Sequence, residues 1–239
     1  MDPYKISDID KLLASNSYVG RGIIVGESEN TGNAVFAYFI MGRSANSRNR
    51  VFHVQDAEVY TRAFNESKVK DPSLIIYPAV KNFENKIIVT NGDQTDTLYQ
   101  GFLRGRSFEE LLCEREFEPD DPNFTPRISA LVELGDSGFR YKMNILKSED
   151  PHGKACARYT FSYTPMPGLG HFIHTYVCDG DPLPSFCGEP ERIHIIDDID
   201  AFTDRIWYNL DEDNKISLYV RYTDPASGTF KDRVVNRNQ

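Results

Sequence analysis

The chain has 239 residues, 40% of them hydrophobic and 26% charged, with a formal net charge of −9 at pH 7. This length and apolar share predict one globular domain over residues 1–239, with a substantial core. The acidic balance excludes a general nucleic-acid binder, no apolar run is long enough to predict a membrane span, and the polar N-terminus is unlike a signal peptide.

The first half of the chain is predicted to consist mainly of strands. Ser7-Asp8-Ile9-Asp10 opens a short helix with Ile9, Leu12 and Leu13 on one face. The turn-rich loop GESENTGN then lies between two apolar runs and predicts a hairpin. The strands predicted in this half are Tyr18–Val25, Ala34–Met41, Arg50–Val59, Leu74–Tyr77 and Lys86–Thr90.

The second half begins with a helix and returns to strands. Ser107 and Glu110 form a capping box before a helix through Leu111, Leu112 and Arg115. Two alternating runs separated by GDSG predict a hairpin with one buried face. The predicted elements are the hairpin Arg127–Leu134 and Phe139–Leu146, the strand pair Ala157–Thr164 and Phe172–Cys178, a helix Asp197–Leu210 capped by Asp197 or Asp198, and a strand Lys215–Tyr222.

Roughly nine or ten strands with three or four helices indicate the α+β class, with two packed, mostly antiparallel sheets and helices outside them. The four cysteines lack CxxC spacing, which favours reduced thiols in a cytoplasmic protein, although a Cys178–Cys187 bridge is the alternative that spacing allows. His171, His174 and Cys178 suggest a metal set at first. On a strand, however, the two histidines would face opposite sides, so packing is the favoured interpretation and no metal is expected.

Three segments have compositions suited to binding or catalysis. GRSANSRNR carries Arg43, Arg48 and Arg50, which could bind phosphate or carboxylate oxygens, or could form an exposed basic loop. FEPDDPNFTPR, residues 117–127, holds closely spaced carboxylates between prolines, which can divide acid and base roles or form a solvated connection.

The third segment is VTNGDQTDTL, residues 89–98. Asn91-Gly92 predicts a turn with positive φ, and Asp93 could cap a following helix, with Asp96 favourable to the helix dipole. The free amides of a first helical turn could then meet an anion or a carbonyl oxygen. Local rules alone favour a plain turn from strand to helix.

Together the three segments resemble the archaeal-type IMP cyclohydrolase family over about Gly20–Leu146. The points of likeness, in order, are Gly20-Arg21, Arg43-Ser44 with Arg48, Tyr77 fourteen residues before Asn91, Asn91-Gly92 with Thr95-Asp96-Thr97, Glu118, and Thr125-Pro126-Arg127-Ile128. Phe124 lengthens the acidic loop, so either Asp120 or Asp121 matches the family's next acid. Residues 1–19 are an N-terminal extension, and the motifs match nothing after about residue 147.

The resemblance implies a four-layer αββα fold similar to the N-terminal nucleophile hydrolases. It also implies closure of 5-formamidoimidazole-4-carboxamide ribotide to inosine monophosphate (IMP) with loss of water, the last step of purine biosynthesis. It implies no metal or organic cofactor. The residues it points to are Arg48, Tyr77, Glu118 and Asp121 for catalysis, and Arg21, Arg43, Asn91, Gly92, Asp93, Thr95, Asp96, Thr125 and Arg127 for substrate binding.

Two other interpretations stay open at this stage. An amidohydrolase or deaminase of a purine precursor could use the same fold, and a non-catalytic nucleotide-binding module is the alternative outside enzymes. Hydrolysis by an N-terminal nucleophile is disfavoured, because Met1 is followed by Asp2 and the first strand begins Gly20-Arg21-Gly22. The expected partner is a small nucleotide, with a homo-oligomer as a further expectation.

Overall fold

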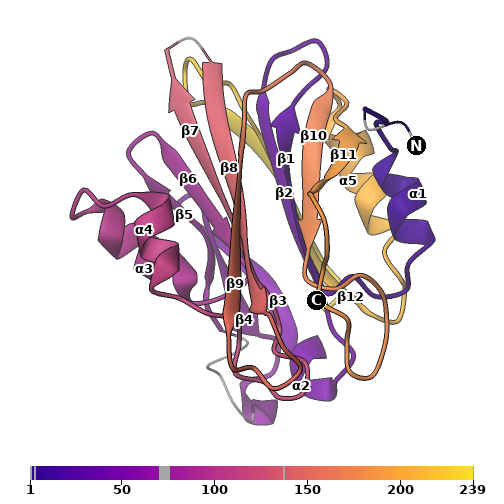
Figure 1. Cartoon of the computed structure of the whole chain (residues 1–239). Coiled ribbons are helices and arrows are strands. Elements are labelled where there is room, and N and C mark those ends of the chain that lie inside the picture. Colours follow the sequence, from indigo (N-terminus) through magenta and orange to yellow (C-terminus); the bar gives the residue numbers. More distant parts are fainter. Residues whose placement is uncertain (1, 3, 70–75, 137, 239) are drawn as a thin grey trace.

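The computed structural model describes residues 2, 4–69, 76–136 and 138–238. Two antiparallel sheets pack face to face (Figure 1). The first sheet has the order β11 (Glu191–His194), β10 (Leu169–His174), β1 (Arg21–Glu27), β2 (Ala34–Met41), β12 (Lys215–Thr223), β13 (Phe230–Asn236). The second has the order β3 (Arg50–Gln55), β4 (Glu58–Ala63), β5 (Pro78–Phe83), β6 (Lys86–Thr90), β7 (Arg127–Gly135), β8 (Gly138–Ser148), β9 (Cys156–Tyr163).

Helices cover the outer face of each sheet (Figure 1). Helices α1 (Ile9–Ala14) and α5 (Ile199–Trp207) lie on the first sheet, and α3 (Gln94–Phe102) and α4 (Phe108–Cys113) lie on the second. A short helix α2 (Ala45–Arg48) and a 3₁₀ turn at Glu66–Lys68 lie outside these layers. The predicted α+β class and the two-sheet sandwich with outer helices are confirmed, whereas the likeness to N-terminal nucleophile hydrolases stays a prediction.

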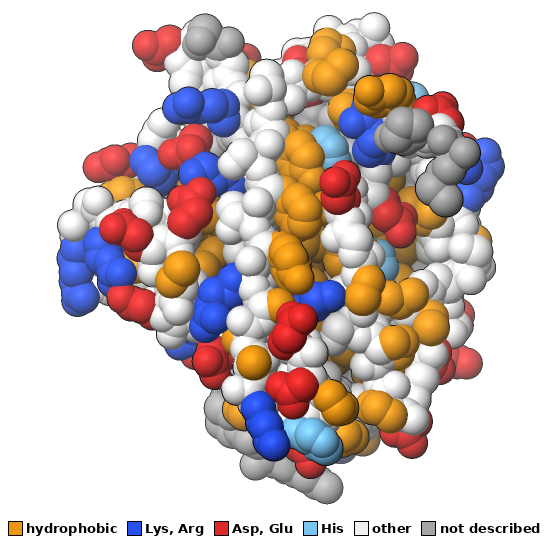
Figure 2. Space-filling model, in the orientation of Figure 1, with side chains coloured by type: hydrophobic (Ala, Val, Ile, Leu, Met, Phe, Trp, Pro, Cys, Tyr) orange, Lys and Arg blue, Asp and Glu red, His pale blue; other side chains and the backbone are white. Residues whose placement is uncertain are grey.

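Three apolar clusters hold the layers together. The largest fills the space between the sheets, and it includes Phe36, Tyr38, Ile128 and Tyr141, all at most 1% exposed. The other two lie under the outer helices, where period-3.6 apolar faces meet the backs of the sheets. Figure 2 shows a strip of hydrophobic side chains running down the middle of one face, along the open edge between the sheets. No helix in the described part of the chain is long and apolar enough to cross a membrane.

Local signals placed several elements correctly. The first helix, the first hairpin, the strand at Lys86–Thr90 and the hairpin β7–β8 are confirmed, with ends shifted by a few residues. The Ser107–Glu110 capping box forms as predicted and starts α4, which ends at Cys113, before Arg115. The helix α5 is capped by Asp198, whose side chain accepts from the backbone amides of Asp200 and Ala201.

Three strand predictions need correction. The run Arg50–Val59 is two strands, because Asp56 and Ala57 both have positive φ and turn the chain without a glycine. The predicted pair Ala157–Thr164 and Phe172–Cys178 is wrong, because β9 pairs with β8 whereas β10 pairs with β1 in the other sheet. Leu74–Tyr77 lies partly outside the described residues; Ile76 and Tyr77 are irregular, and β5 starts at Pro78.

The antiparallel register brings several strand ends to one end of the sandwich. Arg21 at the start of β1 pairs with Ile40 near the end of β2, and its neighbour Gly22 pairs with His174 at the end of β10. In the second sheet, the end of β6 pairs with the start of β7, as Thr90 does with Ser129. The polar residues singled out above lie mainly at these ends.

Candidate functional site

Polar side chains from both sheets meet in the interior at this end of the sandwich. We call this group the inter-sheet cluster. Its members are Arg21, Tyr38, Arg50, Tyr77, Glu118, Thr125 and Tyr176, each at most 8% exposed. Apolar cores rarely hold so many ionisable groups unless they are paired or functional. The cluster is therefore the first candidate for the active site.

Glu118 is the carboxyl of the cluster and is 3% exposed. Its backbone amide donates to the carbonyl of Thr125 at 2.9 Å, which closes the acidic loop between α4 and β7. Burial raises the pKa of Glu118 to about 7, even though the guanidinium groups of Arg21 and Arg127 act in the opposite direction. A carboxyl with this pKa can accept and return a proton near neutral pH.

Arg21 lies close enough to this carboxyl for the two charges to act on each other. Burial disfavours its charge, but Glu118 and the rings of Tyr18 and Tyr176 outweigh that effect and hold the pKa of Arg21 above its ordinary value. Gly20 allows this placement: its φ is +77°, and a Cβ there would lie 2.6 Å from the Tyr176 ring. Only glycine lets β1 start so close to Tyr176, which explains why a glycine precedes Arg21.

A hydroxyl chain links the acidic loop to the first sheet. Thr125 Oγ1 donates to Asp120 Oδ2 at 2.5 Å and lies 2.5 Å from the hydroxyl of Tyr176. Because the threonine hydroxyl has a single hydrogen, Tyr176 must donate to Thr125. The tyrosine oxygen then keeps its lone pairs for a donor such as the nearby Arg21.

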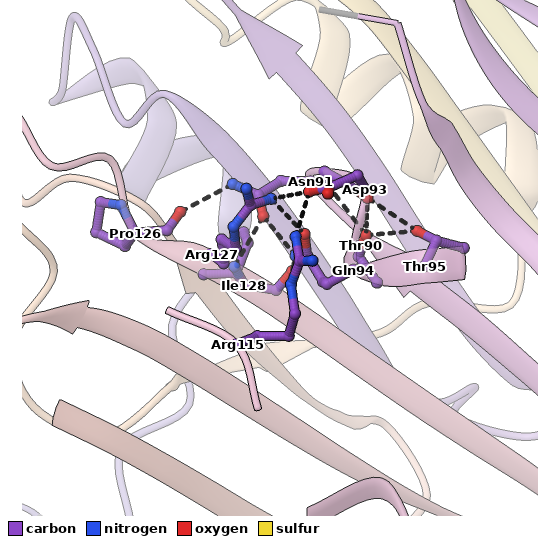
Figure 3. Close-up of polar contacts among 10 residues, drawn as sticks. Thr90, Asn91, Asp93, Gln94, Thr95, Arg115, Pro126, Arg127 and Ile128 are labelled. Carbon is purple, nitrogen blue, oxygen red and sulfur yellow. Dashed lines mark hydrogen bonds and ion pairs between the residues drawn. The ribbon is translucent and has the colours of Figure 1, made fainter. Parts of the chain in front are cut away.

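The turn at Asn91-Gly92 joins β6 to α3 through a dense polar network (Figure 3). Asn91 is fully buried; its Nδ2 donates to the carbonyl of Pro126 at 2.9 Å, and its Oδ1 accepts from the amide of Ile128 at 2.8 Å. Thr95, also fully buried, lies 2.6 Å from the hydroxyl of Thr90. These side chains hold β6 and α3 against the start of β7.

The turn differs from the prediction in two ways. Neither Asn91 nor Gly92 has positive φ. Gly92 is required by a close approach instead, because a Cβ there would lie 2.4 Å from Nη1 of Arg127. Asp93 sits at the N-cap position, but its side chain caps no amide. Its Oδ1 lies 2.6 Å from both Arg127 and Arg115, so Asp93 pairs with two arginines.

Four predicted site residues lie away from the inter-sheet cluster. Arg43 binds Asp179 at 2.6 Å on the surface, and Arg48 donates to the carbonyl of Gly42 at 3.0 Å from the exposed helix α2. Asp96 pairs with Lys81 at 2.8 Å over the second sheet. Asp121 is exposed, and its neighbour Asp120 is the acid that bonds Thr125.

The sequence reasoning missed other members of the cluster. Arg50 lies in the arginine-rich segment, but the sequence motifs do not assign it to the site. Asp120 is outside the cluster and bonds its member Thr125; the sequence left it open as the alternative to Asp121. Tyr38 sits inside an apolar strand, where its ring fits the core pattern and its hydroxyl gives no signal. Tyr176 follows β10, beyond the matched motifs, and no local pattern could have indicated it.

Besides the inter-sheet cluster, the described residues include a hollow on the first sheet, two buried histidines and four cysteines. A hollow of about 550 Å³ is lined by residues including Asp197, Asp200 and Arg233, at the opposite end of the first sheet from Arg21. His171 faces the inter-sheet core, within 2.6 Å of the Tyr141 hydroxyl, whereas His174 packs against Phe172 among the outer residues, as strand alternation predicted. Among the described residues no three His, Cys, Asp or Glu side chains are grouped to hold a metal ion. All four cysteines are free thiols.

Comparison with known proteins adds to this picture. A family model described as IMP cyclohydrolase-like protein matches residues 18–228. The IMP cyclohydrolase of Thermococcus kodakarensis is 32% identical over 121 residues, covering 49% of this chain and 57% of that protein. The enzyme of the same name from Methanosphaera stadtmanae is 27% identical over 127 residues, covering 51% of this chain and 61% of that protein.

A longer alignment is found with the IMP cyclohydrolase of Methanopyrus kandleri, which is 24% identical over 182 residues, covering 71% of this chain and 89% of that protein. The chain thus spans 57% and 61% of the length of the first two relatives. The family match continues past residue 147, where the motifs gave no correspondence, and it includes Tyr176.

Proposed function

Because the chain belongs to the IMP cyclohydrolase-like family, we propose that it closes 5-formamidoimidazole-4-carboxamide ribotide to IMP. The observation that carries this proposal is Glu118, a buried carboxyl with a pKa of about 7 close to the buried Arg21, which also lies close to Tyr77. These residues stand at the positions where the family motifs were matched. Their chemistry suits a reaction that moves protons and stabilises charge on oxygen.

The reaction needs no external nucleophile. The carboxamide nitrogen attacks the formyl carbon, a carbon–nitrogen bond forms, and the formyl oxygen becomes a hydroxyl group. One proton from the carboxamide nitrogen and the single proton of the formamide nitrogen leave with that oxygen as water. The new ring then contains a carbon–nitrogen double bond. An intramolecular closure of this kind gains most from holding the two groups in contact.

We assign the proton transfers to Glu118. Its carboxylate takes a proton from the attacking carboxamide, and its acid form returns a proton to the departing oxygen. A pKa near 7 keeps both forms available at neutral pH. Tyr77 supplies a hydroxyl donor near the formyl group, and Arg21 orients the carboxyl of Glu118. Asp121 is exposed, so we assign it no catalytic role; its neighbour Asp120 acts through Thr125 as a positioning residue.

The remaining predicted residues take supporting roles in this proposal. Asn91, Gly92 and Thr95 fix the turn that places Arg127, and Asp93 holds Arg127 by an ion pair. Arg127 is 7% exposed and lies near Glu118, so we retain it as a substrate-binding residue. Arg43, Arg48 and Asp96 stand outside the cluster, where they could contact only the outer parts of a bound nucleotide.

Three broader expectations remain part of the proposal. We treat residues 1–239 as one domain with 1–19 as an extension, which is supported by the packing of α1 against α5. The free thiols are consistent with a cytoplasmic location. A homo-oligomer is retained as a prediction that size-exclusion chromatography with light scattering would test.

Turnover by the purified protein tests the function. The formylated ribotide is incubated with the wild type and with Glu118→Gln, and IMP is followed by ultraviolet absorbance and chromatography. We expect IMP to form with the wild type, and kcat to fall by about 10²- to 10⁴-fold in the variant. Tight IMP binding without turnover would instead support a nucleotide-binding module, and release of formate or ammonia would support the hydrolase alternatives.

A further inference from the structure

Arg50 is the most deeply buried charged side chain of the inter-sheet cluster, with 0% of its surface exposed. It stands at the start of β3, and its Nε donates to the carbonyl of Ser47 at 2.7 Å. Both terminal nitrogens, Nη1 and Nη2, are buried without a hydrogen-bond partner among the described residues. Burying an unpaired guanidinium is strongly unfavourable, so these donors point to a group that is absent from the free chain.

A second buried arginine shows that the fold can satisfy such a group. Arg221 is 2% exposed on β12, in the other sheet. Its Nη2 donates to the carbonyl of Ala57 at 2.6 Å, its Nε donates to the Tyr219 hydroxyl at 2.9 Å, and Asp232 lies 3.9 Å away. The unused donors of Arg50 are therefore a local property of the inter-sheet cluster.

The surroundings of Arg50 define the charge that it can accept. Burial and the repulsion of Arg21 lower the pKa of Arg50, while the rings of Tyr38 and Tyr77 act in the opposite direction. Arg21 also has a buried Nε without a partner. Glu118 shares this interior, and the charges of both arginines act to lower its pKa. The site thus offers several N–H donors beside one carboxyl.

A phosphate dianion fits this site poorly, because it would meet Glu118 as a like charge in a dry interior. A carbonyl oxygen is neutral when it binds and gains negative charge only during the reaction: the formyl oxygen as its carbon is attacked, and the carboxamide oxygen as its nitrogen loses a proton. The proposed reaction places two such oxygens, formyl and carboxamide, beside the proton-transferring carboxyl. The donors of Arg50 match this chemistry better than they match a phosphate.

We propose that Nη1 and Nη2 of Arg50 bind the carboxamide oxygen of the reacting base, so that the base is held inside the inter-sheet cluster and the phosphate lies at the rim. This inference rests on the proposed function and adds the orientation of the nucleotide. Arg50 touches the substrate at the carboxamide oxygen, which stays on the ring in IMP and in inosine. It donates more strongly as loss of a proton from the carboxamide nitrogen shifts negative charge onto that oxygen.

The test compares Arg50→Met with the matched control Arg221→Met. Turnover of the formylated ribotide gives kcat, thermal unfolding gives Tm, and calorimetry gives the affinities for IMP and for inosine, which lacks the phosphate. We expect Arg50→Met to lower kcat by about 100-fold or more and to leave Tm unchanged or raised. The variant should bind IMP and inosine more weakly than the wild type does, with the same fold-loss of affinity for the two ligands. Arg221→Met should lower Tm and keep kcat.

Other results would overturn the inference. Weaker binding of IMP with unchanged binding of inosine would make Arg50 a phosphate ligand. A lower Tm with unchanged kcat would give Arg50 the same structural role as Arg221. Absence of IMP and inosine binding to the wild type would also contradict it.

A second variant covers a folding failure, and one further outcome separates the inference from the proposed function. If Arg50→Met fails to fold, Arg50→Lys replaces it, because lysine keeps the positive charge but lacks the paired N–H donors of the guanidinium. It should still lower the affinities for IMP and for inosine by the same factor. If the wild type does not turn over the ribotide but the two ligands are weakened equally, the proposed function fails and the orientation stands.

Discussion

The hydroxyl oxygens of Tyr38 and Tyr77 lie 2.7 Å apart and join the two sheets inside the inter-sheet cluster. Either tyrosine could donate, so the free proton of the pair can point to a substrate. The backbone of Tyr77 is fixed as well, because its amide donates to Thr61 Oγ1 at 2.8 Å and its carbonyl accepts from the Thr61 amide at 2.9 Å. This anchoring gives the Tyr77 hydroxyl a defined position.

The tyrosine pair leads to a prediction with an internal control. Tyr77→Phe and Tyr38→Phe each leave one buried hydroxyl without its partner and should each lower the free energy of unfolding by about 1–3 kcal/mol. Only Tyr77→Phe should lower kcat by about 10²-fold, since Tyr77 is proposed to contact the substrate. Denaturant unfolding and steady-state kinetics check both parts. Equal losses of kcat in the two variants would mean that the pair acts as one unit.

The pKa of Glu118 predicts how stability depends on pH. Burial raises this pKa from 4.5 to about 7, so the folded chain binds more protons than the unfolded chain between these values. Stability should therefore fall as pH rises from about 4.5 to about 7, by on the order of 3 kcal/mol for this one group. Glu118→Gln should lack this contribution, and unfolding of both proteins at pH 5 and pH 8 measures it. An unchanged difference between the two proteins would show that the carboxyl is ionised at both pH values.

Two neighbouring acids offer a second matched comparison. Asp120→Ala removes the acceptor of both the Thr125 amide, at 2.6 Å, and the Thr125 hydroxyl, at 2.5 Å. Thr125 is then free to turn from Tyr176, and we expect a loss of about 1–3 kcal/mol in stability and a lower kcat. Asp121→Ala, at an exposed position, should change stability by less than about 0.5 kcal/mol. A larger loss of kcat in Asp121→Ala would restore the role first expected for Asp121.

The close approach at Gly92 gives a steric prediction. Gly92→Ala places a Cβ 2.4 Å from Arg127 Nη1 and 2.7 Å from Gln94 Oε1, so Arg127 must move from its ion pair with Asp93. We expect a loss of about 1–3 kcal/mol in stability together with a raised KM. Gly135→Ala is the control, because among the described residues its Cβ would meet only the Gly138 carbonyl, at 3.6 Å. If Gly92→Ala behaved like Gly135→Ala, the placement of Arg127 would not depend on this contact.

The sequence predicted those parts of the fold that depend on local patterns. Capping residues, alternation and turn composition located the hairpin β7–β8, the helices α4 and α5 and the strand β6. Pairing across sheets was harder, because β9 and β10 are neighbours in sequence but belong to opposite sheets. The edge strand β13 was missed because its largely exposed residues lack a clean alternation.

The candidate site was predicted in part for a similar reason. Tyr77, Glu118, Thr125 and Arg127 belong to motifs, and they converge where the strand ends meet. The places of Arg50 and Tyr176 in the site are set by tertiary packing, which local patterns do not indicate. Arg50 is buried although its segment has the composition of an exposed loop, and Tyr176 joins the site through its hydrogen bond with Thr125. The charged composition around Arg48 favoured an exposed basic loop. Arg48 is indeed exposed, but Arg50 is fully buried, so that interpretation was wrong for Arg50.

The location of bound IMP tests the central claim most directly. A crystal structure of the wild type soaked with IMP should place the purine ring in the inter-sheet cluster, with its carbonyl oxygen in hydrogen-bond reach of Arg50 and the carbon derived from the formyl group next to Glu118. IMP bound instead in the hollow beside Asp197 and Arg233, or with its phosphate on Arg50, would contradict the account.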